Sequence, residues 1–132
     1  MSNIVDTMIK YPKIFNITFT NNSEYLHCLF NKNIQGQAID YIKKYNNELN
    51  LRYINNLGQT LLSVACINKS PLIALHLLST YPDKCNIGYV DNSGSTELSW
   101  ACQYNLKPII YVLLSQYSDK YDLSLSKIYG TT

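Results

Sequence analysis

The sequence predicts an all-α fold, a solenoid of stacked helix pairs joined by extended hairpin loops. Residues 56–91 and 92–127 are identical at fourteen positions without a gap. Self-similarity at a fixed period of this length is typical of repeat architectures. Within each copy, apolar residues recur at helical spacing between Gly, Thr and Pro residues that mark helix ends. Residues 1–132 are therefore predicted to form one repeat domain of about three and a half units.

The identical positions fall into two blocks. The first block is a turn and a short helix, and the second is the end of a longer helix with the loop that follows. The identical pairs are Asn56/Asn92, Gly58/Gly94, Thr60/Thr96, Leu62/Leu98, Ser63/Ser99, Ala65/Ala101, Cys66/Cys102, Ile73/Ile109, Leu77/Leu113, Leu78/Leu114, Ser79/Ser115, Tyr81/Tyr117, Asp83/Asp119 and Lys84/Lys120.

Composition argues against several classes of partner. The formal net charge is +2 and the basic residues are scattered, which does not favour nucleic acid or an anionic membrane. No apolar run approaches the roughly 20 residues that a transmembrane helix needs. The four Cys residues, without a secretion signal, favour a reducing compartment. We therefore expect a cytoplasmic protein with no nucleic-acid and no membrane partner.

The N-terminal part of the chain contains weaker copies. Residues 1–21 are interpreted as a half-repeat cap, because one apolar helical stripe is followed by a proline. Residues 22–55 align in the same register and are interpreted as a degenerate repeat. Short helices are expected at about 24–32 and 36–46, with Gly36 marking the turn between them.

Residues 56–91 are the clearest repeat. A turn ends at Gly58, where a left-handed residue is expected. Thr60 is predicted to cap the short helix through its hydroxyl. Ser70 is predicted to cap the second helix, and Pro71 takes its first position, where a missing N–H is harmless.

The third repeat, residues 92–127, follows the same plan. Residues 83–93 before it are expected to form a long loop that projects as a hairpin. Glu97 stands in the first turn of its short helix, where a negative charge is favourable, and Pro108 marks the start of the second helix. Residues 128–132 fall where another unit would begin and are interpreted as the start of a truncated repeat.

This pattern resembles the ankyrin repeat. In that family the motif Thr-Pro-Leu-His-x-Ala-Ala follows the glycine of the turn. The period of 36 residues differs from the 33 residues of the family. Leu61 and Glu97 replace the Pro of the motif, and Ser63 and Ser99 replace its His. These departures leave the geometry of the loops open. The way in which these repeats depart from the family motif is similar to that of ankyrin proteins of giant DNA viruses of amoebae. The matching residues are Thr60, Leu62 and Ala65, then Thr96, Leu98 and Ala101, and the pairs Leu26-His27, Leu77-Leu78 and Leu113-Leu114.

The resemblance implies a module that binds a partner protein on its concave face, acting on host factors in the host cytoplasm if the protein is viral. Trp100 replaces Val64 of the preceding copy. Its role is either packing between units or an aromatic anchor for a partner, and both interpretations remain open. Positions at the turns differ between copies, as expected where specificity resides. The expected partner-binding residues are Tyr53, Asn55, Tyr89, Asp91, Ser93, Trp100, Gln103 and Tyr104.

No arrangement of residues favours catalysis, a metal or a cofactor. The sequence lacks the C-x-x-C and H-x-x-x-H spacings of zinc sites and any phosphate-binding Gly-rich motif. Cys66 and Cys102 share one repeat position and are expected to be small buried residues. His27 is expected to support a turn, and His76 to be exposed. We therefore expect a non-enzymatic protein without cofactors.

An alternative to partner binding is a structural role. In that hypothesis the units stack or oligomerise through an uncapped C-terminal repeat face, because a repeat without a neighbour leaves its apolar side open. Self-association through the C-terminal end is therefore a second expectation. The identity of a partner and the oligomeric state stay open.

Overall fold

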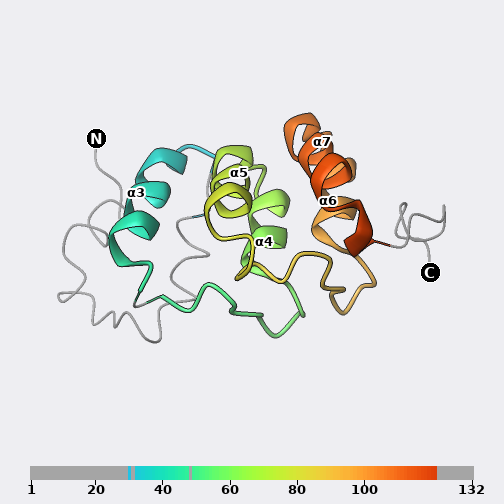
Figure 1. Cartoon of the computed structure of the whole chain (residues 1–132), viewed down its shortest axis with the longest axis horizontal. Helices are drawn as coiled ribbons and strands as arrows, with labels where there is room; N and C mark the ends of the chain where they lie inside the picture. The colour runs from blue at the N-terminus through green and yellow to red at the C-terminus, as the bar shows by residue number, and fades with distance from the viewer. Residues whose placement is uncertain (1–29, 31, 48, 122–132) are drawn as a thin grey trace.

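The computed structural model describes residues 30, 32–47 and 49–121 of the chain. These residues form α3 (Gln35–Tyr45), α4 (Leu61–Ile67), α5 (Pro71–Thr80), α6 (Glu97–Gln103), α7 (Lys107–Gln116) and the short 3-10 helix η1 (Ser118–Lys120) (Figure 1). This part of the chain has no strand. It has an isolated antiparallel bridge between Ile54 and Thr60. The predicted all-α class is thereby confirmed for the described residues. None of their helices has the length and apolar character needed to span a membrane.

Some expected elements lie outside the described residues. These are the half-repeat cap at 1–21, the truncated repeat at 128–132 and most of the helix at 24–32, of which Phe30 and Lys32 are described and are not helical. The helix expected at 36–46 is α3. Gly36 lies within its first turn and does not mark a turn between helices.

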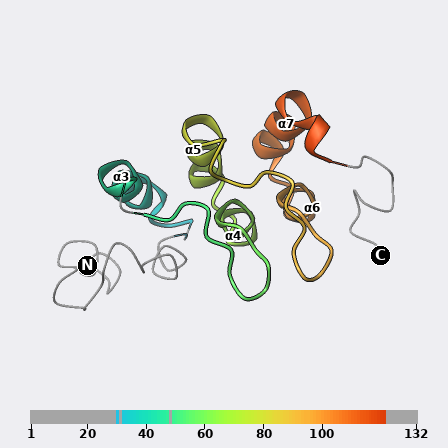
Figure 2. The same ribbon diagram turned by 60° about the horizontal axis from the view of Figure 1, so that its bottom comes forward.

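The helices form two layers. α3, α5 and α7 lie in one layer, and α4 and α6 lie in the other (Figure 2). α5 packs against both α3 and α7, while α4 packs against α6. The chain segments that precede α4 and α6 project away from the helices as hairpin-shaped loops, as expected (Figure 2). The pairs α4–α5 and α6–α7 thus repeat one arrangement along the row.

Local signals at the short helices act as predicted. The Thr60 and Thr96 hydroxyls accept hydrogen bonds from the backbone N–H groups three residues later, so each caps its helix. Gly58 and Gly94 have φ of 77° and 85°, a region that favours glycine. A Cβ on Gly58 would lie 2.8 Å from Asn92 Oδ1, so the approach of the two turns also requires glycine.

The start of α5 is stabilised across the interface between units. Pro71 is its first residue, as predicted, but the Ser70 side chain makes no capping hydrogen bond. Gln35 of α3 supplies the cap, because its Oε1 accepts from the N–H groups of Leu72 at 2.7 Å and Ile73 at 3.3 Å. The prediction of a Ser70 cap is therefore wrong, since an amide from the preceding unit satisfies these donors.

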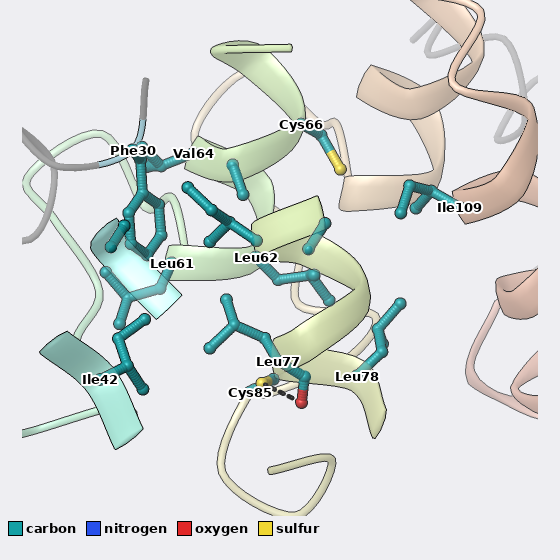
Figure 3. Close-up of a cluster of buried hydrophobic side chains, with 14 of the residues drawn as sticks. Phe30, Ile42, Leu61, Leu62, Val64, Cys66, Leu77, Leu78, Cys85 and Ile109 are labelled. Atoms are coloured by element: carbon teal, nitrogen blue, oxygen red, sulfur yellow. Dashed lines mark hydrogen bonds between the residues drawn. The ribbon is translucent and has the colours of Figure 1, made fainter. Parts of the chain in front are cut away.

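The core is one continuous cluster contributed by α3 to α7, the α-helices of the described residues. Figure 3 shows Leu61, Leu62, Leu77 and Leu78 of α4 and α5 at its centre. Cys85 closes its lower edge, where its thiol donates to the Leu77 carbonyl at 3.5 Å (Figure 3). Each helix pair buries its apolar side against its neighbours, which is how repeat units gain stability.

Burial differs between the copies at the end of the row. Cys66 is buried, and Figure 3 shows its sulfur directed from α4 toward the next helix pair. The equivalent Cys102 is exposed, so its predicted burial is wrong. α6 packs against α4, whereas no described helix packs against the far side of α6. His76 is half-buried, in contrast to the exposed position expected for it.

Candidate protein-interaction surface

An aromatic pair and a lysine form a small patch on the α6 side of the row. Trp100 lies in α6 and Tyr104 follows one turn later, so both rings project in one direction. The rings stack with centroids 6.4 Å apart and 13° between their planes. Lys69, in the turn after α4, places Nζ 5.3 Å from the Tyr104 ring centroid. We call these three residues, which come from two successive repeats, the Trp100 patch.

A buried carboxylate holds Trp100 in place. The indole Nε1–H of Trp100 donates to Asp91 Oδ2 at 3.0 Å. The other oxygen, Oδ1, accepts from the N–H groups of Ser93 and Ser95, both at 2.9 Å, and from the Ser93 hydroxyl at 2.6 Å. Asp91 is only 6% exposed, so the exposed partner-binding position expected for it is not found. Its carboxylate instead closes the turn and orients the indole.

The charge of Asp91 is stabilised by these donors. Burial acts to raise the pKa of its carboxyl group. The hydrogen bonds from Ser93, Ser95 and Trp100 favour the ionised form more strongly and hold the pKa below its usual value. Asp91 therefore stays ionised where it anchors the Trp100 patch.

The preceding turn is built in the same way. Asn55 stands at the repeat position of Asp91, and its Oδ1 accepts from the N–H groups of Leu57 and Gln59, both at 2.9 Å. Its side chain is thus also used within the turn, and it is half-buried. The two turns are linked, since Asn92 donates through its backbone N–H to the Leu57 carbonyl at 3.0 Å and through Nδ2 to the Asn56 carbonyl at 3.2 Å. The turns therefore form a connected edge.

The other expected binding residues are distributed along this edge. Tyr89 is 44% exposed, and Ser93 and Gln103 are exposed as well. Tyr53 is half-buried and packs against the core. Lys69 is not among the predicted binding residues. Its contact with Tyr104 joins two different repeats, so the sequence of neither repeat contains a pattern that predicts it. The structure thus brings Trp100 and Tyr104 together and adds Lys69.

The structure agrees with the packing interpretation of Trp100, and the aromatic-anchor interpretation stays a prediction. Its ring packs against the core cluster, yet it is only half-buried. Packing and a hydrogen bond fix the indole, while part of it remains accessible. A fixed, partly exposed aromatic side chain is well suited to binding because little rotamer freedom remains to be lost.

A second carboxyl group is buried at the start of α6. Glu97 is 0% exposed, although it stands in the first turn of its helix, where a negative charge is favourable. Its Oε1 accepts from the Gly88 N–H and from the Tyr121 hydroxyl, both at 2.6 Å. Oε2 has no hydrogen-bond partner within the described part of the chain. Burial raises the pKa of Glu97, against the opposing effect of the two hydrogen bonds.

The three cysteines of the described part show no sign of activation. Cys66, Cys85 and Cys102 are free thiols. Burial, reinforced by the nearby Glu97, raises the pKa of Cys85 to about 12 and also raises that of Cys66. Reactive cysteines need the opposite shift. Within residues 30, 32–47 and 49–121, no group of His, Cys, Asp and Glu side chains could hold a metal ion.

Replacing Asp91 by Asn tests the anchor. Because the folded pKa of Asp91 is lowered, its ionised form stabilises the fold above the unfolded pKa near 3.8, and this contribution is lost as pH falls through the folded pKa. Asp91→Asn is expected to lower the free energy of unfolding at neutral pH by about 1–2 kcal/mol and to remove this acid dependence. Urea unfolding at several pH values, followed by the fluorescence of the single Trp, measures both effects.

Asp119→Asn provides the matched control, because Asp119 is exposed. It should change the free energy of unfolding at neutral pH by less than about 0.5 kcal/mol, as surface substitutions usually do. Equal acid dependence of the wild-type and Asp91→Asn chains would contradict the role of Asp91.

Comparison with known proteins adds no relative. No protein-family model, curated protein or solved structure matches this chain. Its function is therefore inferred from the contacts, burial and charges of the chain itself.

Proposed function

We propose that the protein is an ankyrin-type interaction module that binds a partner protein on the face formed by α4, α6 and the two linked turns. The Trp100 patch is the observation that carries this proposal. Aromatic residues dominate the binding energy of many interfaces, where they lie in fixed and partly desolvated positions. Trp100 has such a position, because Asp91 holds its indole and Tyr104 stacks on it.

The repeat arrangement supports the ankyrin type. Threonine caps, left-handed glycines and helix pairs recur with the sequence period, and the loops project from one side of the row. Repeat proteins use the extended surfaces of such rows for macromolecular contacts. Architecture alone supports this type of function only by analogy, and the Trp100 patch supports the position that we propose for the contact. We place this role in the cytoplasm.

The chemistry of the patch indicates what a partner presents. The Trp100 and Tyr104 rings offer an apolar platform, and the Lys69 ammonium group beside them retains donors for an acceptor. A partner segment with an apolar side chain next to a carboxylate fits this combination. Ser93 and Gln103, both exposed, add hydrogen-bonding groups at the edge.

Affinity capture with surface variants tests the proposal. Tyr104→Ala removes the ring that joins Trp100 and Lys69 while leaving the Asp91 anchor intact. We expect it to weaken retention of the partner at least about tenfold, the loss of roughly 1.4 kcal/mol or more typical of a hot-spot residue. The measurement compares proteins retained by the full chain and by its variants, using quantitative mass spectrometry.

Tyr111→Ala is the matched control, because Tyr111 is 74% exposed on α7 in the other helix layer. A true partner is retained by this variant and lost by Tyr104→Ala. Bound partner should also protect backbone amides of residues 89–105 from hydrogen exchange. Full retention by a Tyr89→Ala, Tyr104→Ala double variant would refute binding at this face.

A further inference from the structure

The outer side of α7 leaves exposed the repeat positions that are buried on α5. Leu78 of α5 is 2% exposed, whereas Leu114 at the same repeat position of α7 is 42% exposed. Ala74 is buried and its counterpart Ile110 is half-buried. α5 has α7 as its next neighbour in the layer, and no described helix occupies the corresponding place beside α7. The comparison therefore identifies a surface with the character of a unit interface.

This surface is apolar and hollowed. A shallow depression on it is lined by Lys107, Ile110, Tyr111, Leu114 and Ser115, which we call the α7 face. Lys107 carries its only charge. Exposed apolar surfaces of this kind on soluble proteins mark sites of association.

Among the described residues, the charges favour one surface as the occupant of the α7 face. Of the described surfaces, the alternative is the exposed side of α3, at the opposite end of the described row (Figure 2). α3 exposes Asp40, Lys43 and Lys44, and burying these charges against Leu114 would be costly. A second α7 face instead presents apolar groups to apolar groups. Contact between two identical faces has two-fold symmetry, the commonest form of homo-oligomer.

The direction of pairing follows from Lys107. It lies at the start of α7, and the last turn of this helix has no basic residue. In an antiparallel pair each Lys107 lies beside the end of the other α7, where the helix dipole is negative. In a parallel pair the two Lys107 side chains would repel each other.

We propose that two copies of this chain associate through their α7 faces, with the α7 helices packed antiparallel about a two-fold axis near Tyr111. This surface lies on α7, in the other layer from the Trp100 patch of α6, so the two proposals are independent (Figure 2). Partner binding can fail while self-association holds, and the reverse is equally possible.

Sedimentation velocity of the full chain tests the association. The wild-type protein should pass from monomer to dimer between about 1 and 300 μM, a range typical of weak association. Leu114→Lys is expected to raise the dimer dissociation constant at least about tenfold, because it buries a charge at the centre of the contact. Leu72→Lys is the matched control, since Leu72 is also exposed but lies on α5.

Cross-linking tests the two-fold geometry. In a Cys102→Ser background, Tyr111→Cys should form a covalent dimer on mild oxidation, while Ser79→Cys, exposed on α5, should not. A wild-type chain that stays monomeric, or a dimer unaffected by Leu114→Lys, would overturn the proposal. A monomer destabilised by Leu114→Lys would also do so, because it would mean that the chain covers this face itself.

Discussion

Glu97→Ala is expected to lower the free energy of unfolding by about 3 kcal/mol, because it creates a cavity and leaves two partly buried donors unpaired. Those donors are the Gly88 N–H and the Tyr121 hydroxyl, which both bond Oε1 of Glu97. They join the loop before α6 and the segment after α7 to the start of α6. Urea unfolding followed by circular dichroism gives the free energy.

Glu97→Gln separates the hydrogen bonds from the charge. The amide oxygen can accept both bonds, so this variant should retain most of the stability that Glu97→Ala loses. The folded pKa of Glu97 is raised, so its contribution is fully present below the unfolded pKa near 4.5. It is lost as pH rises through the folded pKa, since the fold must then hold a buried charge. Wild-type stability should therefore fall over this range, and that of Glu97→Gln should not.

The preceding repeat carries an apolar side chain at the position of Glu97. Leu61 stands there and is 1% exposed. If Glu97→Ala changed stability by less than about 1 kcal/mol, the usual effect of a surface substitution, the bonds at Oε1 would have no structural role. A wild-type pH dependence identical to that of Glu97→Gln would show that Glu97 is not a titrating buried group.

The same substitution in two repeats should have very different effects. Leu78→Ala is expected to cost about 2–5 kcal/mol, as for other fully buried leucines. Leu114→Ala is expected to cost less than about 1 kcal/mol, because its side chain is already partly in water. Urea unfolding of both variants at low protein concentration gives the comparison without contributions from association.

The pair serves as its own control, because both leucines occupy one repeat position in helices of equal length. Similar losses of stability in the two variants would mean that Leu114 is as well packed as Leu78. That outcome would contradict both the order of helices in the row and the open α7 face.

The sequence by itself determined the helical class, the repeat period and the ends of the short helices. Thr60 and Thr96 cap their helices through bonds that span three residues, and Gly58 and Gly94 adopt left-handed backbone at their turns. These features follow from local geometry, so a single segment contains the information. The aromatic pair Trp100 and Tyr104 was also predictable, because residues four apart share one side of a helix.

Tertiary structure alone decided the features that join one repeat to another. Gln35 caps α5 from the preceding unit, Lys69 lies over Tyr104, and Glu97 is buried although its carboxyl group is ionisable. Cys66 and Cys102 have the same sequence context, yet only Cys66 is buried. Burial depends on what packs against a residue, and neighbours in a row of repeats come from segments distant in sequence. Equivalent positions in two repeats therefore predict equivalent helices but not equivalent environments.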